Sequence, residues 1–213
     1  MRSVRRRYSS LLKHQPAPVV LEFALALSDG ARWEERLIAC EIIAAHPAAP
    51  AALNERLITR MAKGLCDWGT VDLFGVTILG PAWREGRVSD AAIHKLARSP
   101  DRWHRRLAVV ATVPLNSRAR GAQPGGDARR TLAVCRLLLT DRDDMVVKAL
   151  SWALRELAKR NAAAIEDFVV KHDARLAPRV RREVSNKLRT GLKTPRPKSA
   201  KRSAGAAARS SPA

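Results

Sequence analysis

A single carboxylate interrupts an apolar stretch of the chain, one helical turn after a tryptophan. Trp68 and Asp72 stand at positions i and i+4, so a helix would place both side chains on one face. Gly75 continues that face and would leave it open beside the carboxylate. An aspartate within an apolar helix costs stability unless it has a partner or a task. A carboxylate beside an electron-rich indole ring is suited to stabilising a developing positive charge.

Two further groups could join this face. Trp103 and Arg106 stand at i and i+3. Lys148, Trp152 and Arg155 share one face of a later predicted helix. With the first group they would bring two tryptophan rings, one carboxylate and several cations onto one concave surface.

Each of these residues also has a structural interpretation. The two tryptophans could be ordinary core residues. Asp72 could form a salt bridge with a buried arginine, and Arg155 could orient this carboxylate. Arg106 and Lys148 could be solvated charges on helix faces.

The net charge is +20, from 40 basic and 20 acidic side chains. Residues 1–13 and 192–213 together hold 11 of the basic side chains and no acid, which leaves 29 basic against 20 acidic side chains in the body. A basic body favours a polyanionic partner, because each neutralised phosphate releases condensed counterions. Charge therefore indicates nucleic acid, with a solvated basic surface as the alternative.

The chain is predicted to be all-α. Alanine and leucine are abundant, apolar residues recur at helical spacing, and no segment alternates with a period of two. Ser89 and Asp101 are expected N-caps, and prolines, among them Pro81, fall at the predicted junctions. The predicted helices span residues 17–28, 33–46, 51–64, 68–80, 89–98, 102–113, 127–139, 143–160, 162–172 and 177–189.

An internal repeat relates three of these helices. Residues 32–39 resemble residues 102–109, and a related helix opens at Asp143. Two helices in each unit of about 35–42 residues predict a HEAT-like helical-repeat solenoid with a concave basic face. Arg36, Arg106 and Lys148 occupy the same place in successive copies, so stacking would line up three cations for a phosphate backbone.

The rest of the sequence sets boundaries and excludes several functions. We expect a basic N-terminal arm (1–15), one repeat domain (16–191) and a disordered basic tail (192–213), with an extended loop near residues 117–127. Three widely spaced cysteines are expected in the core of a cytoplasmic, nucleoid-associated and monomeric protein. No metal-ligand spacing, cofactor motif or apolar run of ~20 residues is present, so we expect no metal, no cofactor and no membrane span.

Three segments resemble the AlkD-like DNA alkylation repair family, in the family's order and with about its spacing. They run from Asp67 to Asp72, from Arg102 to Ala108 and from Lys148 to Glu156, and the last is the most distinctive. The resemblance covers about residues 20–190. It implies a HEAT-like fold that wraps duplex DNA and excises cationic N3- and N7-alkylated purines without a metal.

The resemblance also implies residue roles. Asp72 would be the catalytic carboxylate, Trp68 and Trp152 would flank the sugar and backbone of the lesion, and Arg106 would hold a phosphate. From their repeat positions and helix faces, and not from the resemblance, Arg36, Lys148, Arg155 and Trp103 are expected to complete the DNA-binding surface. The base would stay largely stacked, whereas most glycosylases flip it into a pocket.

The chemistry agrees with a single acid. A cationic alkylpurine leaves as a neutral base and needs no general acid, whereas most glycoside hydrolysis needs two carboxylates. One departure is the N-terminus, where the family has additional helices and this chain is expected to have only the basic arm. A non-catalytic HEAT-like module that binds DNA or RNA structure, or a protein scaffold, is therefore the alternative.

Overall fold

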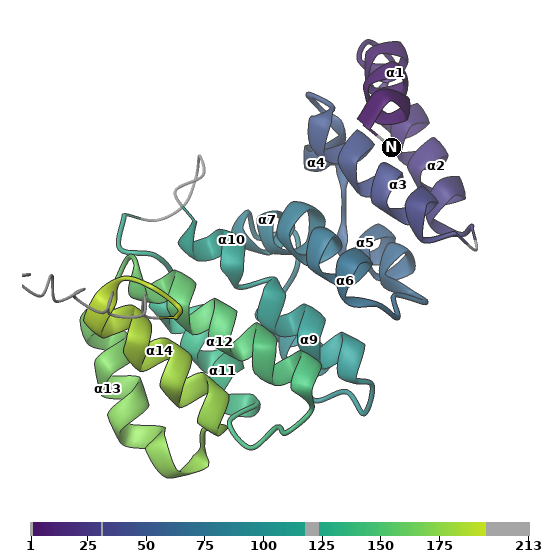
Figure 1. The fold of residues 1–213 in the computed structure, drawn as a ribbon. Helices are drawn as coiled ribbons and strands as arrows, with labels where there is room; N and C mark the ends of the chain where they lie inside the picture. Colours follow the sequence, from purple (N-terminus) through teal and green to yellow (C-terminus); the bar gives the residue numbers. More distant parts are fainter. Residues whose placement is uncertain (1, 31, 118–123, 195–213) are drawn as a thin grey trace, which may run out of the picture.

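The computed structural model describes residues 2–30, 32–117 and 124–194, and these contain helices, turns and connecting segments but no strand (Figure 1). The all-α prediction is confirmed. The elements are α1 (Arg2–Leu12), α2 (Ala17–Ser28), α3 (Trp33–Ala45), α4 (Ala49–Ala52), α5 (Glu55–Ala62), α6 (Trp68–Phe74), the π-helical turn η1 (Gly75–Leu79), α7 (Gly80–Arg84), α8 (Asp90–Ala97), α9 (Arg102–Val110), α10 (Val113–Asn116), α11 (Ala128–Leu137), α12 (Asp144–Ala158), α13 (Ala162–His172), the 3₁₀ turn η2 (Asp173–Arg175) and α14 (Pro178–Thr190).

The helices stack as successive pairs, which makes the chain a helical-repeat solenoid. Helices α3, α6, α9, α12 and α14 contact one another in this order and are called here the second-helix row. Helices α2, α4, α5, α8, α11 and α13 precede them in each pair and are called the first-helix row. Figure 1 shows the pairs following one another from the purple N-terminal end to the yellow C-terminal end.

The helix boundaries agree with the sequence in most places. Ser89 and Asp101 are N-caps, since their side chains accept hydrogen bonds from the backbone N–H groups of Ala92 (3.1 Å) and Trp103 (2.8 Å). The predicted helix 51–64 is divided into α4 and α5, because the chain is extended at Leu53.

The expected arm forms a helix of its own. Helix α1 contacts α3, and the ring of Tyr8 stacks on Phe23 with centroids 5.6 Å apart. Val4, Tyr8 and Leu11 recur at helical spacing among the arginines. The run of basic residues hid this weak apolar stripe at the level of sequence.

The predicted helix 68–80 continues to Arg84 through a wider turn. The N–H of Gly80 donates to the carbonyl of Gly75, five residues earlier, which defines η1. Pro81 therefore lies inside the helical run and not at a junction, which corrects the prediction. Because proline supplies no N–H, the helix has to loosen near it.

The face opposite Asp72 packs into the core as expected. Val71, Phe74 and Ile78 are at most 2% exposed. Trp83 is fully buried, and its Nε1 donates to the carboxylate of Asp90 at 2.8 Å.

Gly75 does not leave an open face beside the carboxylate. The residue is buried where η1 crosses α9, and a Cβ at this position would lie 2.8 Å from Cγ1 of Val110 and 3.3 Å from Cδ1 of Leu107. The glycine is required for close approach of two helices, so the prediction was wrong about its role. This close approach brings Asp72, one turn earlier, within reach of α9.

Some predictions lie partly outside the described residues. These are the loop near 117–127, of which 118–123 are not described, and the tail 192–213, of which only 192–194 are described. The domain boundaries also stay predictions. No helix among the described residues combines the length and the apolar character that crossing a membrane requires.

Gly75→Ala tests the helix crossing. We expect a loss of about 1–3 kcal/mol in the free energy of unfolding, because the added methyl group must displace Val110. Urea denaturation measures this loss. Gly125→Ala, where a Cβ would meet nothing within 4 Å, is the matched control. A Gly75→Ala/Val110→Ala double variant should lose less than the sum of the two single losses, and strict additivity would contradict the proposed contact.

Candidate functional site

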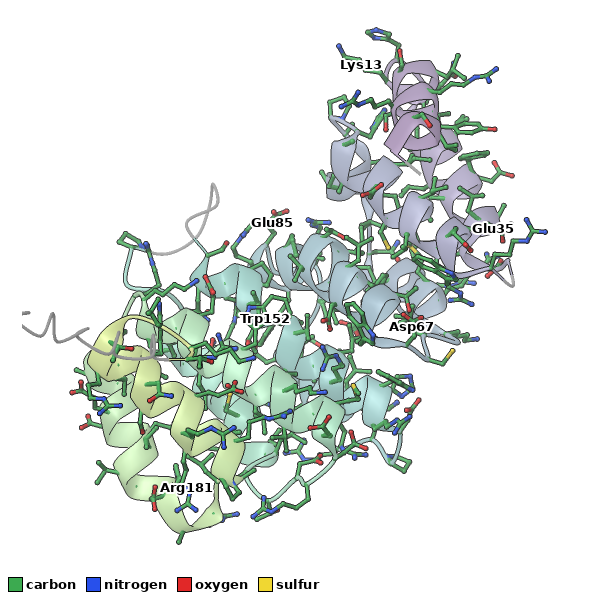
Figure 2. The ribbon with its side chains drawn as sticks, viewed as in Figure 1. Lys13, Glu35, Asp67, Glu85, Trp152 and Arg181 are labelled. Carbon is green, nitrogen blue, oxygen red and sulfur yellow. The ribbon has the colours of Figure 1, made fainter. Side chains whose placement is uncertain are left out.

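Helix α6 begins at an aspartate N-cap that positions Trp68. Asp67 accepts a hydrogen bond from the N–H of Thr70 at 2.9 Å, and the hydroxyl of Thr70 donates back to the Asp67 carboxylate. Trp68 is then the first residue of the helix, and 62% of its surface is exposed. A core role for Trp68 is therefore excluded. Figure 2 shows Asp67 at the start of α6 and Trp152 on α12.

Asp72 and Arg106 form a bidentate ion pair between α6 and α9. Nε of Arg106 donates to Oδ1 of Asp72 at 2.8 Å, and Nη2 donates to Oδ2 at 2.7 Å. The side chain of Arg106 is only 7% exposed, and that of Asp72 is 20% exposed. The salt bridge with a buried arginine, which the sequence left as an alternative, is present.

Arg106 also binds the next helix. Its Nη1 donates to the backbone carbonyl of Met145, in the first turn of α12. One guanidinium therefore joins three consecutive members of the second-helix row. The geometry fixes the Asp72 carboxylate in direction while each of its oxygens keeps a further lone pair for water or a ligand.

Lys148 is engaged on its own helix. Its Nζ lies 2.6 Å from Oδ2 of Asp144, and Oδ1 of the same carboxylate accepts from Arg179 of α14 at 2.8 Å. Lys148 remains 45% exposed at its side chain. The hydrogen bond from Lys148, with the charges of Arg179 and Arg106, holds the pKa of Asp144 below its usual range despite some desolvation.

Arg155 does not orient Asp72. Its Nε donates to the hydroxyl of Ser151 at 3.2 Å and lies 3.8 Å from Glu183 of α14. Partial burial lowers the pKa of the Arg155 guanidinium, against the opposing effect of Glu183. Glu183 is itself buried and accepts from Ser151 at 2.6 Å, so it is the structural partner of this arginine.

Arg36 takes part in a contact within the fold. Its Nη1 donates to the carbonyl of Lys63 at 2.7 Å, at the end of α5. Arg36 and Arg106 thus both donate to a backbone carbonyl of a later helix pair, Arg36 at the end of α5 and Arg106 in the first turn of α12. Lys148, the third cation of the predicted alignment, pairs instead with a carboxylate of its own helix, and the alignment along a phosphate backbone stays a prediction.

The other two tryptophans of the predicted site are half-buried. Trp152 and Trp103 both pack against the hydrophobic core. The guanidinium carbon of Arg102 lies 4.9 Å from the centroid of the Trp103 ring, which shields part of that ring. Trp152 lies between Lys148 and Arg155 on α12, so the structure keeps the predicted grouping of these three side chains along one helix.

Sequence reasoning missed several residues around the site. Asp144 forms an ion pair with Lys148, and Glu183 forms one with Arg155. Met145 contributes only a backbone carbonyl, which accepts from Arg106. Backbone acceptors carry no residue-type signal, whereas an acid four residues after an arginine on α14 gave a weak one. Among the described residues, no group of three or more His, Cys, Asp and Glu is placed to hold a metal ion.

The three cysteines differ in exposure, which corrects the expectation that all are core residues. Cys40 and Cys135 are buried, but Cys66 is exposed, two residues before Trp68. Burial raises the pKa of the Cys40 and Cys135 thiols to about 12.

Thiol labelling checks this difference. At pH 8 the folded protein should take up one iodoacetamide per chain, at Cys66, because reaction requires an accessible thiolate. Mass spectrometry of tryptic peptides identifies the labelled site. In about 6–8 M urea, which unfolds the protein, iodoacetamide should modify all three thiols. Rapid labelling of Cys135 in the folded protein would contradict the packing around α11.

A double-mutant cycle checks the ion pair. Asp72→Ala should lower the free energy of unfolding by about 2–4 kcal/mol, because it leaves the buried Arg106 guanidinium without its anion. Arg106→Met in the same background should restore a large part of this loss. Urea denaturation of the four proteins gives the coupling energy, and a value near zero would show that the pair contributes nothing to folding.

Comparison with known families agrees with this helical architecture. A family model described as DNA alkylation repair enzyme matches residues 1–188 of the 213, including helix α1. No curated protein matches the chain with significance. The match spans all described helices up to the last turn of α14. The chain therefore belongs to the DNA alkylation repair enzyme family, whose substrate is DNA.

Proposed function

We propose that the protein is a DNA glycosylase that hydrolyses the N-glycosidic bond of cationic N3- or N7-alkylated purines in duplex DNA. The observation that carries this proposal is the Asp72 carboxylate. It is fixed in direction by two hydrogen bonds, partly open to solvent, and on the same helix face as the exposed Trp68. Membership of the alkylation repair family supports the choice of DNA as substrate.

The reaction needs one carboxylate and no general acid. The bond between C1′ of the sugar and the ring nitrogen breaks, and its electron pair neutralises the cationic purine, which leaves as a neutral base. The sugar becomes an oxocarbenium-like cation, which the Asp72 carboxylate stabilises. Water then attacks C1′ and gives up a proton, so an abasic site remains. The proposal requires neither a metal nor a cofactor.

Arg106 determines how much of this stabilisation is realised. A carboxylate about 4 Å from the sugar cation contributes about 4 kcal/mol at an effective dielectric constant near 20. A guanidinium about 7 Å away opposes it by about 2 kcal/mol under the same conditions. The remaining 2 kcal/mol corresponds to roughly a 30-fold acceleration, whereas the full effect corresponds to roughly 1,000-fold.

Phosphate binding would relieve this opposition. We infer that a DNA phosphate beside the lesion shares the Arg106 guanidinium, which neutralises its charge while the carboxylate stays in place. Asp72 is 20% exposed at its side chain and shares a helix face with Trp68, and Lys148 of α12 is 45% exposed for a second phosphate contact. Trp152 and Trp68 would then lie on either side of the lesion's sugar, with the base remaining in the stack.

One observation favours the non-catalytic alternative. Arg106 is almost fully buried and joins three helices, which is what a structural ion pair does. In a module that only binds DNA structure, Asp72 would serve the fold alone. The two functions differ in base release, which only the glycosylase performs.

Asp72→Asn tests the proposed chemistry. We expect release of 7-methylguanine from methylated duplex DNA to fall by about 30- to 1,000-fold, because the neutral amide cannot stabilise the sugar cation. Single-turnover base release is measured by chromatography, without added metal. Duplex affinity, measured by fluorescence anisotropy, should change less than about threefold. A change of this size in binding free energy is smaller than the contribution of one charge-assisted hydrogen bond.

Asp67→Asn is the matched control. It makes the same chemical change five residues earlier, and asparagine is as good an N-cap as aspartate. This control should keep base release near that of the wild type. Equal rates for the wild type and Asp72→Asn would remove Asp72 from the reaction, and no base release by the wild type would favour the DNA-binding module.

A further inference from the structure

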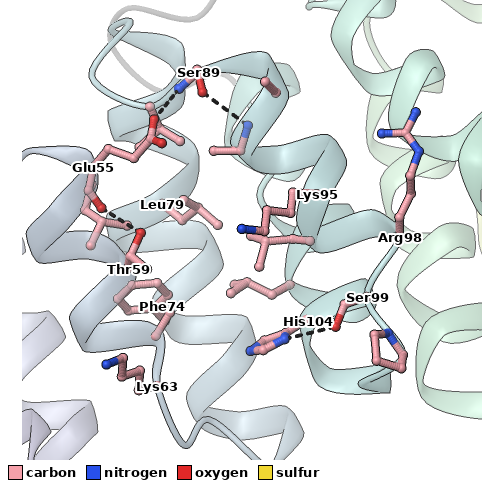
Figure 3. Close-up of a pocket in the computed structure, with 18 residues that line it drawn as sticks. Glu55, Thr59, Lys63, Phe74, Leu79, Ser89, Lys95, Arg98, Ser99 and His104 are labelled. Carbon is pink, nitrogen blue, oxygen red and sulfur yellow. Dashed lines mark hydrogen bonds between the residues drawn. The ribbon is translucent and has the colours of Figure 1, made fainter.

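A cavity lies on the side of the first-helix row. It occupies about 920 Å³ between α5, α6, η1, α8 and α9 (Figure 3). Its floor is apolar and is formed by Ile58, Phe74, Leu79, Val88, Leu96 and Leu107. This set of residues and the side chains at its rim are called here the groove.

The groove is separate from the candidate site. Phe74 follows Asp72 by two residues, which places the two side chains about 200° apart around α6. Leu107 follows Arg106 by one residue, about 100° away around α9. None of the residues of the Asp72 site lines the groove, so an occupant of the groove leaves that site accessible.

The rim of the groove is positively charged. Lys63, Lys95 and Arg98 lie at its edge, against the single acid Glu55. Glu55 already accepts a hydrogen bond from the N–H of Ser89 at 2.9 Å. Within the described residues, Lys63 and Lys95 have no carboxylate partner, and Figure 3 shows Lys95 reaching over the groove. The uncompensated charge favours an anionic occupant.

Three segments of the chain have the wrong chemistry for the groove. Residues 195–213 contain five basic side chains, no acid and no large apolar side chain. Residues 118–123 contain Arg118 and Arg120 and are likewise without acid. The exposed apolar residues of α1 stand among arginines, so a second copy offering this helix would place like charges against the rim.

A nucleic acid fits the rim but not the floor. Phosphates would gain from the lysines, yet a sugar-phosphate backbone would leave the apolar floor in contact with water. A protein segment that combines a bulky apolar side chain with carboxylates satisfies both parts of the groove. Glutamate and aspartate beside leucine or phenylalanine in a short helix or extended peptide have this chemistry.

We propose that the groove is a docking site for an acidic segment of a partner protein, with an apolar side chain on its floor and carboxylates at Lys63 and Lys95. Docking there is compatible with simultaneous binding of DNA at the Asp72 site. The groove would thus bring the enzyme to a partner without blocking its substrate.

Peptide display with the full chain tests this proposal. Random 12-residue peptides are selected on the wild type, with counter-selection on Ala92→Trp, which fills the groove from α8. We expect enriched peptides with two or more acids next to a leucine or phenylalanine. A fluorescein-labelled copy of the most enriched peptide should bind Lys95→Glu at least tenfold more weakly than the wild type in fluorescence polarisation.

Lys171→Glu is the matched control, since it makes the same charge change at an exposed position on α13. This variant should bind the peptide like the wild type. Lys95→Glu is a surface change that keeps the fold testable if Ala92→Trp does not fold. Enrichment without acids, or equal binding to Lys95→Glu and the wild type, would overturn the proposal, as would displacement of the peptide by undamaged duplex DNA. Base release should be the same in Lys95→Glu and the wild type, so this outcome is independent of the proposed glycosylase activity.

Discussion

The ion pair between Asp72 and Arg106 connects the fold to the site. It removes a guanidinium almost completely from water, and only the two hydrogen bonds to the carboxylate and the bond to the Met145 carbonyl compensate for this. The pair can form because Gly75 lets η1 approach α9 closely, one turn further along. Stability and reactivity therefore depend on the same carboxylate, which must neutralise a buried cation in the free protein and face a sugar cation during the proposed reaction.

Fewer basic side chains are free to bind a polyanion than the net charge indicates. Arg105 pairs with Asp141 at 2.7 Å, Arg179 pairs with Asp144, and Glu183 gathers cations around the end of α12. These pairs connect neighbouring members of the solenoid. Part of the arginine content therefore holds successive helix pairs together, whereas Lys148 stays 45% exposed at its side chain beside Asp144.

The sequence predicted the helices well where local signals were strong. Aspartate and serine N-caps and the apolar stripe of α6 fixed the boundaries and the buried face, because these signals act within one or two turns. It also brought Asp72 and Arg106 into one proposed site. Their direct contact, the crossing at Gly75 and the exposure of Cys66 depend on how helices 30 or more residues apart pack, which no local pattern encodes. Helix α1 was missed because its apolar stripe is short and lies among arginines.

The N-caps of the second-helix row have a consequence for how a polyanion can be held. Helices α6, α9 and α12 each begin at an aspartate, namely Asp67, Asp101 and Asp143, whose carboxylate accepts from the free N–H groups of the first turn. Helix starts are otherwise favourable places for phosphate, because the helix dipole and unpaired N–H groups converge there. Here those positions already carry built-in anions. A DNA backbone crossing this row has to be bound by the sides of the helices, through long cationic side chains and not through main-chain amides. Because these side chains are flexible, they can contact phosphates at different positions along the strand.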